Sequence, residues 1–343
     1  MKKTALVTGI RGQDGAYLAK LLLDKGYRVI GADRRSSDYI NWRLRELNIN
    51  DKIEFHYMDL LELTNIIEVL RKYKPDEIYN LGAQSFVTTS FTQPILTSEV
   101  DGIGVLRLLE AMRQECPGAR FYQASTSEMF GKVIESPQSE KTPFYPRSAY
   151  GVAKLFGHWI TVNYRESYDM FCTSGILFNH ESPLRGLEFV SRKITSTVSR
   201  MHHGLDEKLV LGNLKAKRDW GFAQDYVEGM WRMLQADVPD DFVLATGNTF
   251  MVETFVEKSF KVINIDLVWE GEGIDQKGYD KKTGKCLVEV SNEFFRPAEV
   301  DLLLGDATKA RTQLGWQPKV DFGQLVEMMM EADLRRVQRD SNT

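Results

Sequence analysis

The sequence has few cysteines and no grouping of residues typical of a metal site. Only three cysteines, Cys116, Cys172 and Cys286, occur among 343 residues, and they are widely spaced. An odd, scattered set is unlike a disulfide framework, so we expect reduced thiols and a cytoplasmic protein. The five histidines and these cysteines show no zinc-like spacing, so no metal is expected.

Long hydrophobic runs and an excess of one charge are also lacking. No apolar stretch approaches the ~20 residues of a membrane-spanning helix. The apolar run near the start is broken by Gly9 and Arg11, too early for a signal peptide. The net charge of −4 predicts no basic surface for nucleic acid or anionic lipid. We therefore expect neither a membrane nor a nucleic acid among the partners.

What the sequence does contain is a regular alternation of strand-like and helix-like segments over its first 180 residues. The expected strands are 4–8, 28–32, 53–57, 77–81, 120–124 and 171–178, and the expected helices between them are 14–25, 64–73, 100–114 and 149–167. This alternation predicts an α/β protein with a Rossmann-type doubly wound parallel sheet, covered by helices on both faces. Ligands of such sheets bind beyond the carboxyl ends of the strands.

The pattern loosens after residue 180. Helical periodicity returns near 188–202, 223–235, 251–262 and 323–339, and the glycine- and lysine-rich stretch 271–285 is expected to be an exposed loop. We expect residues 1–180 to form mainly a nucleotide-binding Rossmann domain. Residues 181–343 are expected to form mainly a smaller, discontinuous substrate-binding lobe, with some segments returning to the Rossmann sheet.

A glycine-rich turn follows the first expected strand and opens the first expected helix. It consists of Gly9, Ile10, Arg11, Gly12, Gln13, Asp14 and Gly15. Glycines at this spacing let the backbone turn tightly and approach a pyrophosphate, and the free amides at the helix start supply donors to it. In a strand–turn–helix context, this pattern predicts dinucleotide binding rather than a merely structural turn.

The residues after the second expected strand bear on which dinucleotide binds. Asp33 could accept from the ribose hydroxyls of NAD, whereas Arg34, Arg35 and Ser36 suit the additional phosphate of NADP. We favour NADP, but Asp33 leaves the preference open, and the two arginines could instead form surface or intersubunit ion pairs. Further cofactor contacts are expected after the third and fourth strands, at Asp59, Leu60, Leu81, Gly82, Ala83, Gln84 and Ser85.

Two short stretches further along the chain carry the chemistry. Tyr150 and Lys154 are four residues apart in one expected helix, so they share a face. A lysine beside a phenol stabilises the phenolate, which predicts that Tyr150 acts as a base toward a sugar or alcohol hydroxyl. Taken alone, this spacing also fits a solvated amphipathic face. The catalytic interpretation is favoured because Thr126, Ser127 and Glu128 follow the preceding expected strand.

Together these motifs resemble the extended short-chain dehydrogenase/reductase family. Three longer strings, at residues 175–183, 216–221 and 295–300, narrow the resemblance to the GDP-mannose 4,6-dehydratases, over residues 3 to 337. The resemblance implies conversion of GDP-mannose to GDP-4-keto-6-deoxymannose by oxidation at carbon 4, loss of water across carbons 5 and 6, and hydride return to carbon 6. It also implies NADP as cofactor, a GDP-sugar as substrate, and a homodimer or homotetramer.

The resemblance also implies a role for each site residue. Tyr150 takes the proton of the 4-hydroxyl, Lys154 orients the nicotinamide ribose, Thr126 binds the carbon-4 oxygen, and Glu128 removes the carbon-5 proton. Without the surrounding motifs, Glu128 could be a solvent-facing loop carboxylate and His180 a packing residue. The implied cofactor contacts are Tyr150, Lys154, His180 and Arg185, and the implied substrate contacts are Ser85, Thr126, Ser127, Glu128, Asn179, Lys193, Arg218, Arg296 and Glu299.

Three other functions fit parts of the pattern. A nucleotide-sugar 4-epimerase or 4-reductase would use the same scaffold, but it would not need Glu128 to remove a carbon-5 proton. A dehydratase for a related GDP-sugar, such as a GDP-manno-heptose, would use unchanged chemistry at carbons 4, 5 and 6. A non-catalytic dinucleotide sensor would be expected to lack the pair formed by Tyr150 and Lys154, which is present.

Overall fold

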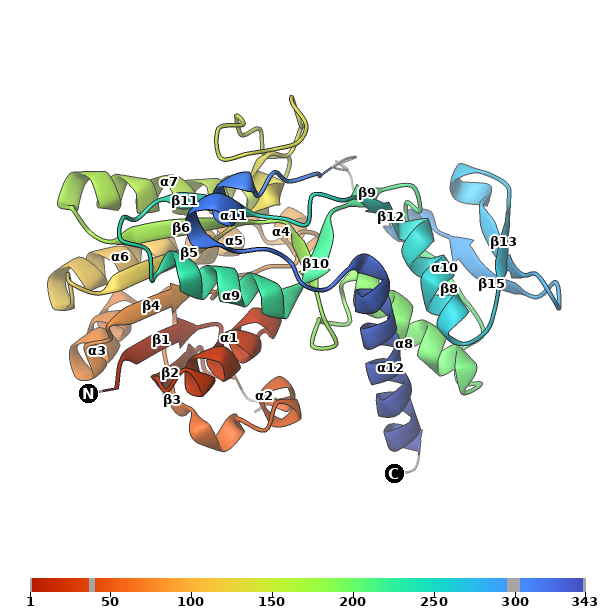
Figure 1. The fold of residues 1–343 in the computed structure, drawn as a ribbon, viewed down its shortest axis with the longest axis horizontal. Helices are drawn as coiled ribbons and strands as arrows, with labels where there is room; N and C mark the ends of the chain where they lie inside the picture. The colour runs from red at the N-terminus through yellow and green to blue at the C-terminus, as the bar shows by residue number, and fades with distance from the viewer. Residues whose placement is uncertain (1, 37–40, 295–302, 342–343) are drawn as a thin grey trace.

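Seven parallel strands form the main sheet, in the order β11-β6-β5-β4-β1-β2-β3 (Figure 1). The structure, a computed structural model, describes residues 2–36, 41–294 and 303–341. The strands are β1 (Thr4–Thr8), β2 (Arg28–Asp33), β3 (Glu54–Tyr57), β4 (Glu77–Asn80), β5 (Arg120–Thr126), β6 (Cys172–Leu177) and β11 (Asp241–Leu244). The strand order reverses at β1 and β4, as in a doubly wound Rossmann sheet, so the predicted fold class is confirmed.

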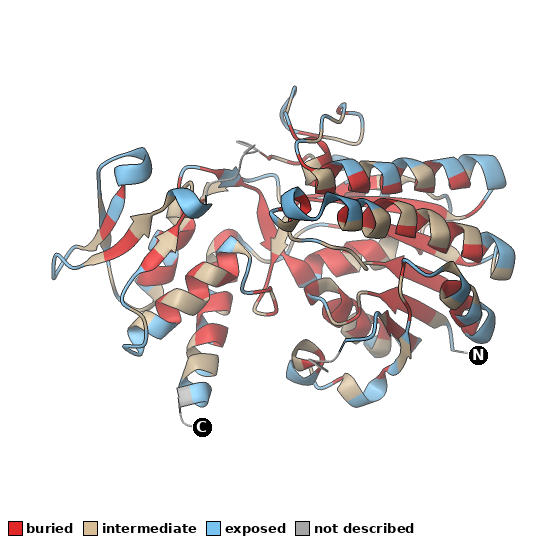
Figure 2. Ribbon diagram, turned by 180° about the vertical axis from the view of Figure 1, so that it is seen from behind, coloured by how far each residue is buried: buried red, intermediate tan, exposed pale blue. Residues whose placement is uncertain are grey.

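Alternate residues of the central strands enter two separate cores, one on each face of the sheet. The helices α1 (Gln13–Asp24) and α9 (Ala223–Met233) cover one face, and α3 (Leu63–Tyr73), α6 (Gly104–Glu115) and α7 (Ala149–Tyr168) cover the other. In β1, Ala5 and Val7 belong to the first core and Leu6 to the second. Burial on both faces explains the uninterrupted apolar run of Ala5, Leu6 and Val7, and Figure 2 shows the central strands buried between the helical layers.

The segments after residue 181 divide between the main sheet and a second lobe. β11 pairs with β6, and α9 packs on α1, so both belong to the Rossmann layers. The second lobe lies at the other end of the molecule (Figure 1). It contains α8 (Val190–His202), α10 (Val252–Val262), α12 (Phe322–Ser341) and a sheet of β8 (Leu209–Leu211), β13 (Leu267–Glu270), β14 (Lys277–Asp280) and β15 (Cys286–Val290). Within the described ranges, no helix combines the length and apolarity that crossing a membrane would require.

The expectation of an exposed loop over residues 271–285 is wrong in part. Strand β14 lies within this stretch and pairs antiparallel with β13 and β15. A Cβ on Gly278 would lie 2.9 Å from the Trp269 ring, so glycine makes room for that ring between the strands. In the sequence such a glycine looks like a loop residue, because the side chain that requires a glycine there belongs to a neighbouring strand.

The helix expected over residues 100–114 is interrupted at its start. Glu99–Ile103 form one π turn, and the regular helix α6 begins only at Gly104. The turn packs against α7, where a Cβ on Gly157 would lie 3.0 Å from the Asp101 carbonyl oxygen. Single π turns often occur at functional sites, and this one carries the buried side chain of Asp101 and packs against α7.

A buried ion pair joins two helices of the second lobe. Asp333 of α12 accepts hydrogen bonds from Arg192 Nε at 2.7 Å and from Thr195 Oγ1 at 2.7 Å, both on α8. The Asp333 and Arg192 side chains are almost completely excluded from solvent. Loss of one partner would leave the other charge buried without compensation, which is the costly case for an ion pair.

We expect Asp333→Ala to lower the free energy of unfolding by about 3–5 kcal/mol, because Arg192 would remain buried without its carboxylate. Glu331→Ala is the matched control, since Glu331 lies on the same helix in an exposed pair with Arg335 and should change stability by less than about 1 kcal/mol. Urea unfolding followed by circular dichroism measures both variants. Equal unfolding midpoints for the two variants would contradict the assigned role of the buried pair.

Candidate active site

The glycine turn brings three backbone segments together at the end of β1. Gly9 has a φ of +64°, and a Cβ on it would lie 2.9 Å from backbone atoms of Leu81 and Gly82. A Cβ on Gly15 would lie 2.4 Å from the Gly9 carbonyl oxygen. Helix α1 begins after Gly12, and no side chain caps its first amides. The turn therefore offers an uncapped helix N-terminus and a close backbone approach, which fit a dinucleotide pyrophosphate.

A cavity of about 180 Å³ lies beside this turn, beyond the carboxyl ends of β1, β4, β5 and β6. The predicted site residues that line it are Gly9, Gly12, Gln13, Asp14, Gly15, Leu81, Ala83, Ser85, Thr126, Ser127, Glu128, Tyr150, Lys154, Asn179, His180 and Arg185. The structure thus brings together residues from five separate predicted motifs. We call this space the cofactor cavity.

The remaining predicted residues lie around or away from the cofactor cavity. Ile10 is buried under the turn, and Leu60 packs against Gly82. The other predicted cofactor residues that do not line the cavity are Arg11, Arg34, Arg35, Ser36, Asp59 and Gln84. Lys193 and Arg218 line a second cavity, which is described below. Arg296 and Glu299 lie outside the described residues.

The tyrosine and lysine of the Tyr-x-x-x-Lys motif are both buried in the first turns of α7. The helix begins at Ser148, whose Oγ accepts from the Gly151 N–H at 3.0 Å. Tyr150 and Lys154 are only 8% and 4% exposed, so the alternative of a solvated amphipathic face is wrong. Lys154 Nζ lies 5.8 Å from the Tyr150 ring centroid and donates to the Ala124 carbonyl oxygen at 3.1 Å.

The pKa of Tyr150 differs from the sequence-based expectation. Burial raises the pKa of its phenol, and the Asp101 and Glu128 carboxylates raise it further. A hydrogen bond with Thr126 and the charge of Arg185 lower it, but they do not offset burial. The expectation that Lys154 would bring the Tyr150 pKa near neutrality is therefore wrong for this structure. The lysine ammonium is itself buried, and burial lowers its own pKa while Asp101 opposes that change.

Sequence reasoning missed Asp101. Its Oδ1 accepts from the Gln84 N–H at 2.7 Å, while its Oδ2 is buried without a hydrogen-bond partner among the described residues. Burial raises the Asp101 pKa to about 6, and the charge of Lys154 opposes this rise. The carboxylate thus gives Lys154 a buried counter-charge. Its only sequence signal was an Asp-Gly pair inside a helical pattern, which is too common to single out.

Thr126, Glu128 and Tyr150 form one hydrogen-bonded group. A 3-10 turn over Ser127–Met129 follows β5, and Thr126 Oγ1 accepts from the Glu128 N–H at 3.2 Å. The Thr126 side chain also shares a hydrogen bond with the Tyr150 phenol. Glu128 lines both the cofactor cavity and the neighbouring cavity. The group can therefore exchange protons with two adjacent carbons of a ligand that reaches across both.

The second cavity, of about 430 Å³, adjoins the first through Glu128, Asn179 and Arg185. Three predicted cations line it, namely Arg185, Lys193 and Arg218. Its walls include aromatic rings that the sequence did not indicate as a group, namely Phe86, Phe91, Phe189, Trp220 and Phe294. The Asn179 side-chain oxygen is buried without a partner among the described residues. Cations, aromatic rings and an unsatisfied acceptor together suit a nucleoside diphosphate bearing a sugar.

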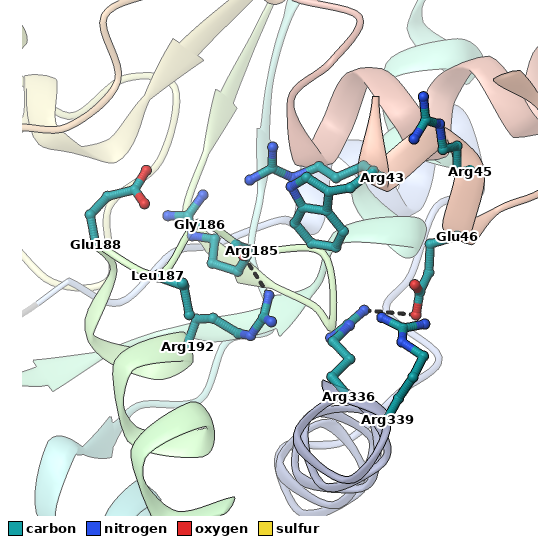
Figure 3. Close-up of a pocket in the computed structure, with 11 residues that line it drawn as sticks. Arg43, Arg45, Glu46, Arg185, Gly186, Leu187, Glu188, Arg192, Arg336 and Arg339 are labelled. Carbon is teal, nitrogen blue, oxygen red and sulfur yellow. Dashed lines mark hydrogen bonds and ion pairs between the residues drawn. The ribbon is translucent and has the colours of Figure 1, made fainter. Parts of the chain in front are cut away.

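A third cavity, of about 820 Å³, lies beside Arg185 where α2 (Trp42–Glu46) faces α12 (Figure 3). Its arginines are Arg43, Arg45, Arg185, Arg192, Arg336 and Arg339. Arg192 donates to the Arg185 carbonyl oxygen at 2.8 Å, and Arg336 donates to Glu46 at 3.0 Å. These bonds tie α2 and the segment around Arg185 to the second lobe, so we interpret the arginines as a structural junction.

Comparison with known proteins decides the family. The sequence model for "GDP-mannose 4,6 dehydratase" matches residues 6–329. The chain belongs to the GDP-mannose 4,6-dehydratase family. It is 51% identical to the GDP-mannose 4,6 dehydratase of Homo sapiens, over 99% of this chain and 94% of that protein. It is 52% identical to the GDP-mannose 4,6-dehydratase of Sinorhizobium fredii, over 97% of each.

Solved structures of more distant enzymes share the fold of this GDP-mannose 4,6-dehydratase family member. DesIV, a dTDP-glucose 4,6-dehydratase from Streptomyces venezuelae with NAD and TYD bound, is 19% identical over 98% of each chain, with a TM-score of 0.82. UDP-glucose 4-epimerase from Thermotoga maritima is 22% identical over 97% of this chain and 99% of that one, with a TM-score of 0.81. At these identities the likeness shows the shared fold alone.

We expect Gly15→Ala to weaken NADP⁺ binding by about tenfold or more. The new methyl group would lie 2.4 Å from the Gly9 carbonyl oxygen and would push the turn out of its position. Gly118→Ala is the matched control, because a Cβ there has no neighbour within 4 Å. Isothermal titration of each variant with NADP⁺ measures the effect. Unchanged affinity in Gly15→Ala would show that the turn does not hold the dinucleotide.

Proposed function

We propose that this protein is a GDP-mannose 4,6-dehydratase, a lyase that converts GDP-mannose to GDP-4-keto-6-deoxymannose. The observation that carries the proposal is the placement of Glu128 beside Tyr150, with Thr126 bonded to both, where the two cavities meet. Oxidation at carbon 4 requires one proton-transfer group, the tyrosine, beside the hydride acceptor. Loss of water across carbons 5 and 6 requires a second proton-transfer group. The curated relatives of the same name support GDP-mannose as the substrate.

The residues divide the chemistry between adjacent sugar carbons. Tyr150 takes the proton of the 4-hydroxyl as a phenolate, the form that the neighbouring Lys154 ammonium favours, and the Thr126 hydroxyl stabilises the charge that develops on that oxygen. When bound, the nicotinamide of NADP supplies the acceptor of the carbon-4 hydride and its later donor to carbon 6. Glu128 removes the carbon-5 proton, which the adjacent ketone has made acidic, and protonates the hydroxyl that leaves carbon 6 as water. The proton that Tyr150 took then returns to carbon 5 as carbon 6 accepts the hydride, so the protons balance. Asp101 opposes loss of the charge on Lys154 in this buried setting.

NADP rather than NAD is proposed as the cofactor. Asp33, the residue that could favour NAD, is occupied by protein groups, because Arg11 lies 3.9 Å away and the Arg34 N–H donates to it at 2.9 Å. Arg34 and Arg35 follow it on an exposed segment. Two guanidinium groups at the end of β2 suit the additional phosphate of NADP.

The GDP-sugar is proposed to occupy the second cavity, with its sugar toward Glu128. Lys193 and Arg218 supply positive charge for the diphosphate, and the unsatisfied Asn179 oxygen can accept from a sugar hydroxyl. In this proposal, residues 1–180 mainly bind the dinucleotide and residues 181–343 mainly bind the substrate. Arg296 and Glu299 remain proposed substrate contacts on the ground of the motif match.

The proposal is tested by incubating the purified protein with GDP-mannose, a GDP-manno-heptose and dTDP-glucose, and by following the loss of water by mass spectrometry. GDP-mannose should lose one water with no net consumption of added nicotinamide. Net accumulation of NADPH in proportion to product would contradict the internal return of the hydride. Preferred dehydration of the heptose would retain the chemistry but change the substrate.

Glu128→Gln should reduce dehydration by about a hundredfold or more, because the side chain can no longer take the carbon-5 proton. Glu166→Gln is the control, since Glu166 is an exposed carboxylate on α7, and its rate should match that of the wild type. The same mass assay measures both variants. Full dehydration by Glu128→Gln would exclude the proposed role, and interconversion of 4-epimers would instead indicate an epimerase.

We also propose that two copies of the chain associate through α7. Val152, Phe156 and Trp159 recur at helical spacing on its outer face and are 54%, 41% and 54% exposed. Ile95, on the adjoining helix α5 (Pro94–Ser98), extends this apolar surface. The same stripe on a second copy would bury all of these side chains in an isologous contact.

Trp159→Glu should shift the protein from dimer toward monomer, because each contact would then bury two unpaired carboxylates. Val238→Glu is the control, since Val238 is an exposed apolar residue that is not part of α7. Analytical ultracentrifugation over a range of concentrations measures the association. A wild type that sediments as a monomer at every concentration would contradict the proposed contact.

A cytoplasmic location is proposed from the thiols. All three cysteines, Cys116, Cys172 and Cys286, are free in the structure, and Cys172 is buried. Burial raises the pKa of Cys116 to about 11 and that of Cys172 to about 12, so neither thiol is prone to react. Unpaired thiols of this kind persist in a reducing compartment.

A further inference from the structure

A half-buried histidine and a carboxylate form a close pair in the wall of the cofactor cavity. His180 Nε2 lies 2.7 Å from Asp14 Oδ2, and His180 Nδ1 lies 2.7 Å from the Phe178 carbonyl oxygen. The His180 ring also stacks on Tyr226, with centroids 4.7 Å apart. These three contacts fix the plane of the imidazole and the partner of each ring nitrogen.

The partners determine how many protons the pair holds. A carbonyl oxygen can only accept, so Nδ1 must carry a hydrogen toward Phe178. A neutral ring would then direct the lone pair of Nε2 at the Asp14 carboxylate, which is repulsive at this distance. The contact becomes favourable when one further proton lies between Nε2 and Oδ2. His180 and Asp14 are therefore assigned as an imidazolium and a carboxylate that share this proton.

The pair stands where the phosphates of a dinucleotide would lie. Asp14 is the second residue of α1, and both Asp14 and His180 line the cofactor cavity together with Gly12. Gln13 Nε2 donates to Asp14 Oδ1 at 3.1 Å, so the carboxylate is held in place at both oxygens. A helix N-terminus attracts anions, but an uncompensated carboxylate in its first turn would repel a pyrophosphate.

We propose that the proton shared by His180 and Asp14 controls how tightly the site binds the dinucleotide phosphates. With the proton in place, the pair is neutral, and the positive end of α1 remains available to the pyrophosphate. When His180 loses the proton, the negative charge of Asp14 faces the phosphates and affinity falls. His180 is thus a positioning residue for the phosphate site. The inference rests on the proposed binding of NADP.

The surrounding groups determine the direction of the pH dependence. Burial by itself lowers the His180 pKa, but the charge and hydrogen bond of Asp14 outweigh burial and raise it above 6.5, while Arg185 opposes the rise. Burial raises the Asp14 pKa, and His180, Gln13 and Arg185 together bring it below its ordinary value. The Asp14 charge also acts to raise the pKa of Arg43 on α2 and of Lys154 on α7. The geometry of the contact calls for the shared proton, and dinucleotide affinity should decline as pH rises through the raised His180 pKa.

The protonation state can be measured without any ligand. In ¹⁵N-histidine-labelled protein, both ring nitrogens of His180 should show the shifts of protonated imidazolium at pH 7. Their titration should lie above the ordinary histidine range. His180→Gln identifies the signal among the five histidines by removing it. A neutral imidazole at pH 7, with a hydrogen on Nδ1 alone, would overturn the assignment.

The effect on binding is tested by a double-mutant cycle with NADP⁺ as the ligand. His180→Gln keeps an N–H donor for Asp14 but removes the charge, so affinity should fall by about tenfold or more. Asp14→Asn can donate to a neutral His180 Nε2, so its affinity should no longer follow the histidine titration. In the Asp14→Asn background, His180→Gln should cost less than about threefold, because no carboxylate remains to be neutralised.

Failure of the shared-proton inference can be distinguished from failure of the proposed NADP binding. An equal loss from His180→Gln with and without Asp14 would show that the histidine acts by packing, and would overturn the inference. Wild-type affinity that stays constant through the His180 titration would overturn it as well. Failure of the wild type to bind NADP⁺ at any pH would instead remove the proposed cofactor, whatever the ¹⁵N shifts show.

Discussion

The close approach of the Gly9–Gly15 turn to the end of β4 is the constraint on which the rest of the site depends. Side chains at Gly9 or Gly15 would collide with backbone, so β1, β4 and α1 can meet only because these positions carry hydrogen. Their meeting leaves the start of α1 uncapped at the edge of the sheet. The side chains proposed to transfer protons reach the same edge, because Thr126 and Glu128 follow from β5 and Tyr150 lies on α7.

Charged groups at the site are balanced in pairs. In each pair, one member lies on an element of the Rossmann layers and lines the cofactor cavity. Asp101 provides the counter-charge of Lys154 from a π turn. Asp14 is balanced by His180, which comes from the short strand β7 (Asn179–Glu181) that leads to the second lobe. Such pairing allows ionised groups to remain in a largely dry site, where an isolated charge would shift its pKa and neutralise.

Local motifs predicted much of this protein because they act through nearest neighbours. The strand–turn–helix at Gly9 to Gly15 and the helix that carries Tyr150 and Lys154 are both present, since glycine spacing and helical periodicity determine them over a few residues. Predictions from the sequence failed where contacts between distant segments determine the structure or the pKa. The strand inside 271–285, the buried Asp101 and the raised Tyr150 pKa all depend on what packs against them from elsewhere in the chain.

The sequence by itself determined the order of strands and helices, the glycine-rich turn and the family, because each depends on short-range spacing and residue type. Only the tertiary structure decided that Lys154 contacts a carbonyl oxygen, that aromatic rings from several distant segments wall one cavity, and that Asp14 meets His180 across 166 residues. The physical reason is that pKa, burial and hydrogen-bond partners are properties of an environment, which forms only when remote segments pack together.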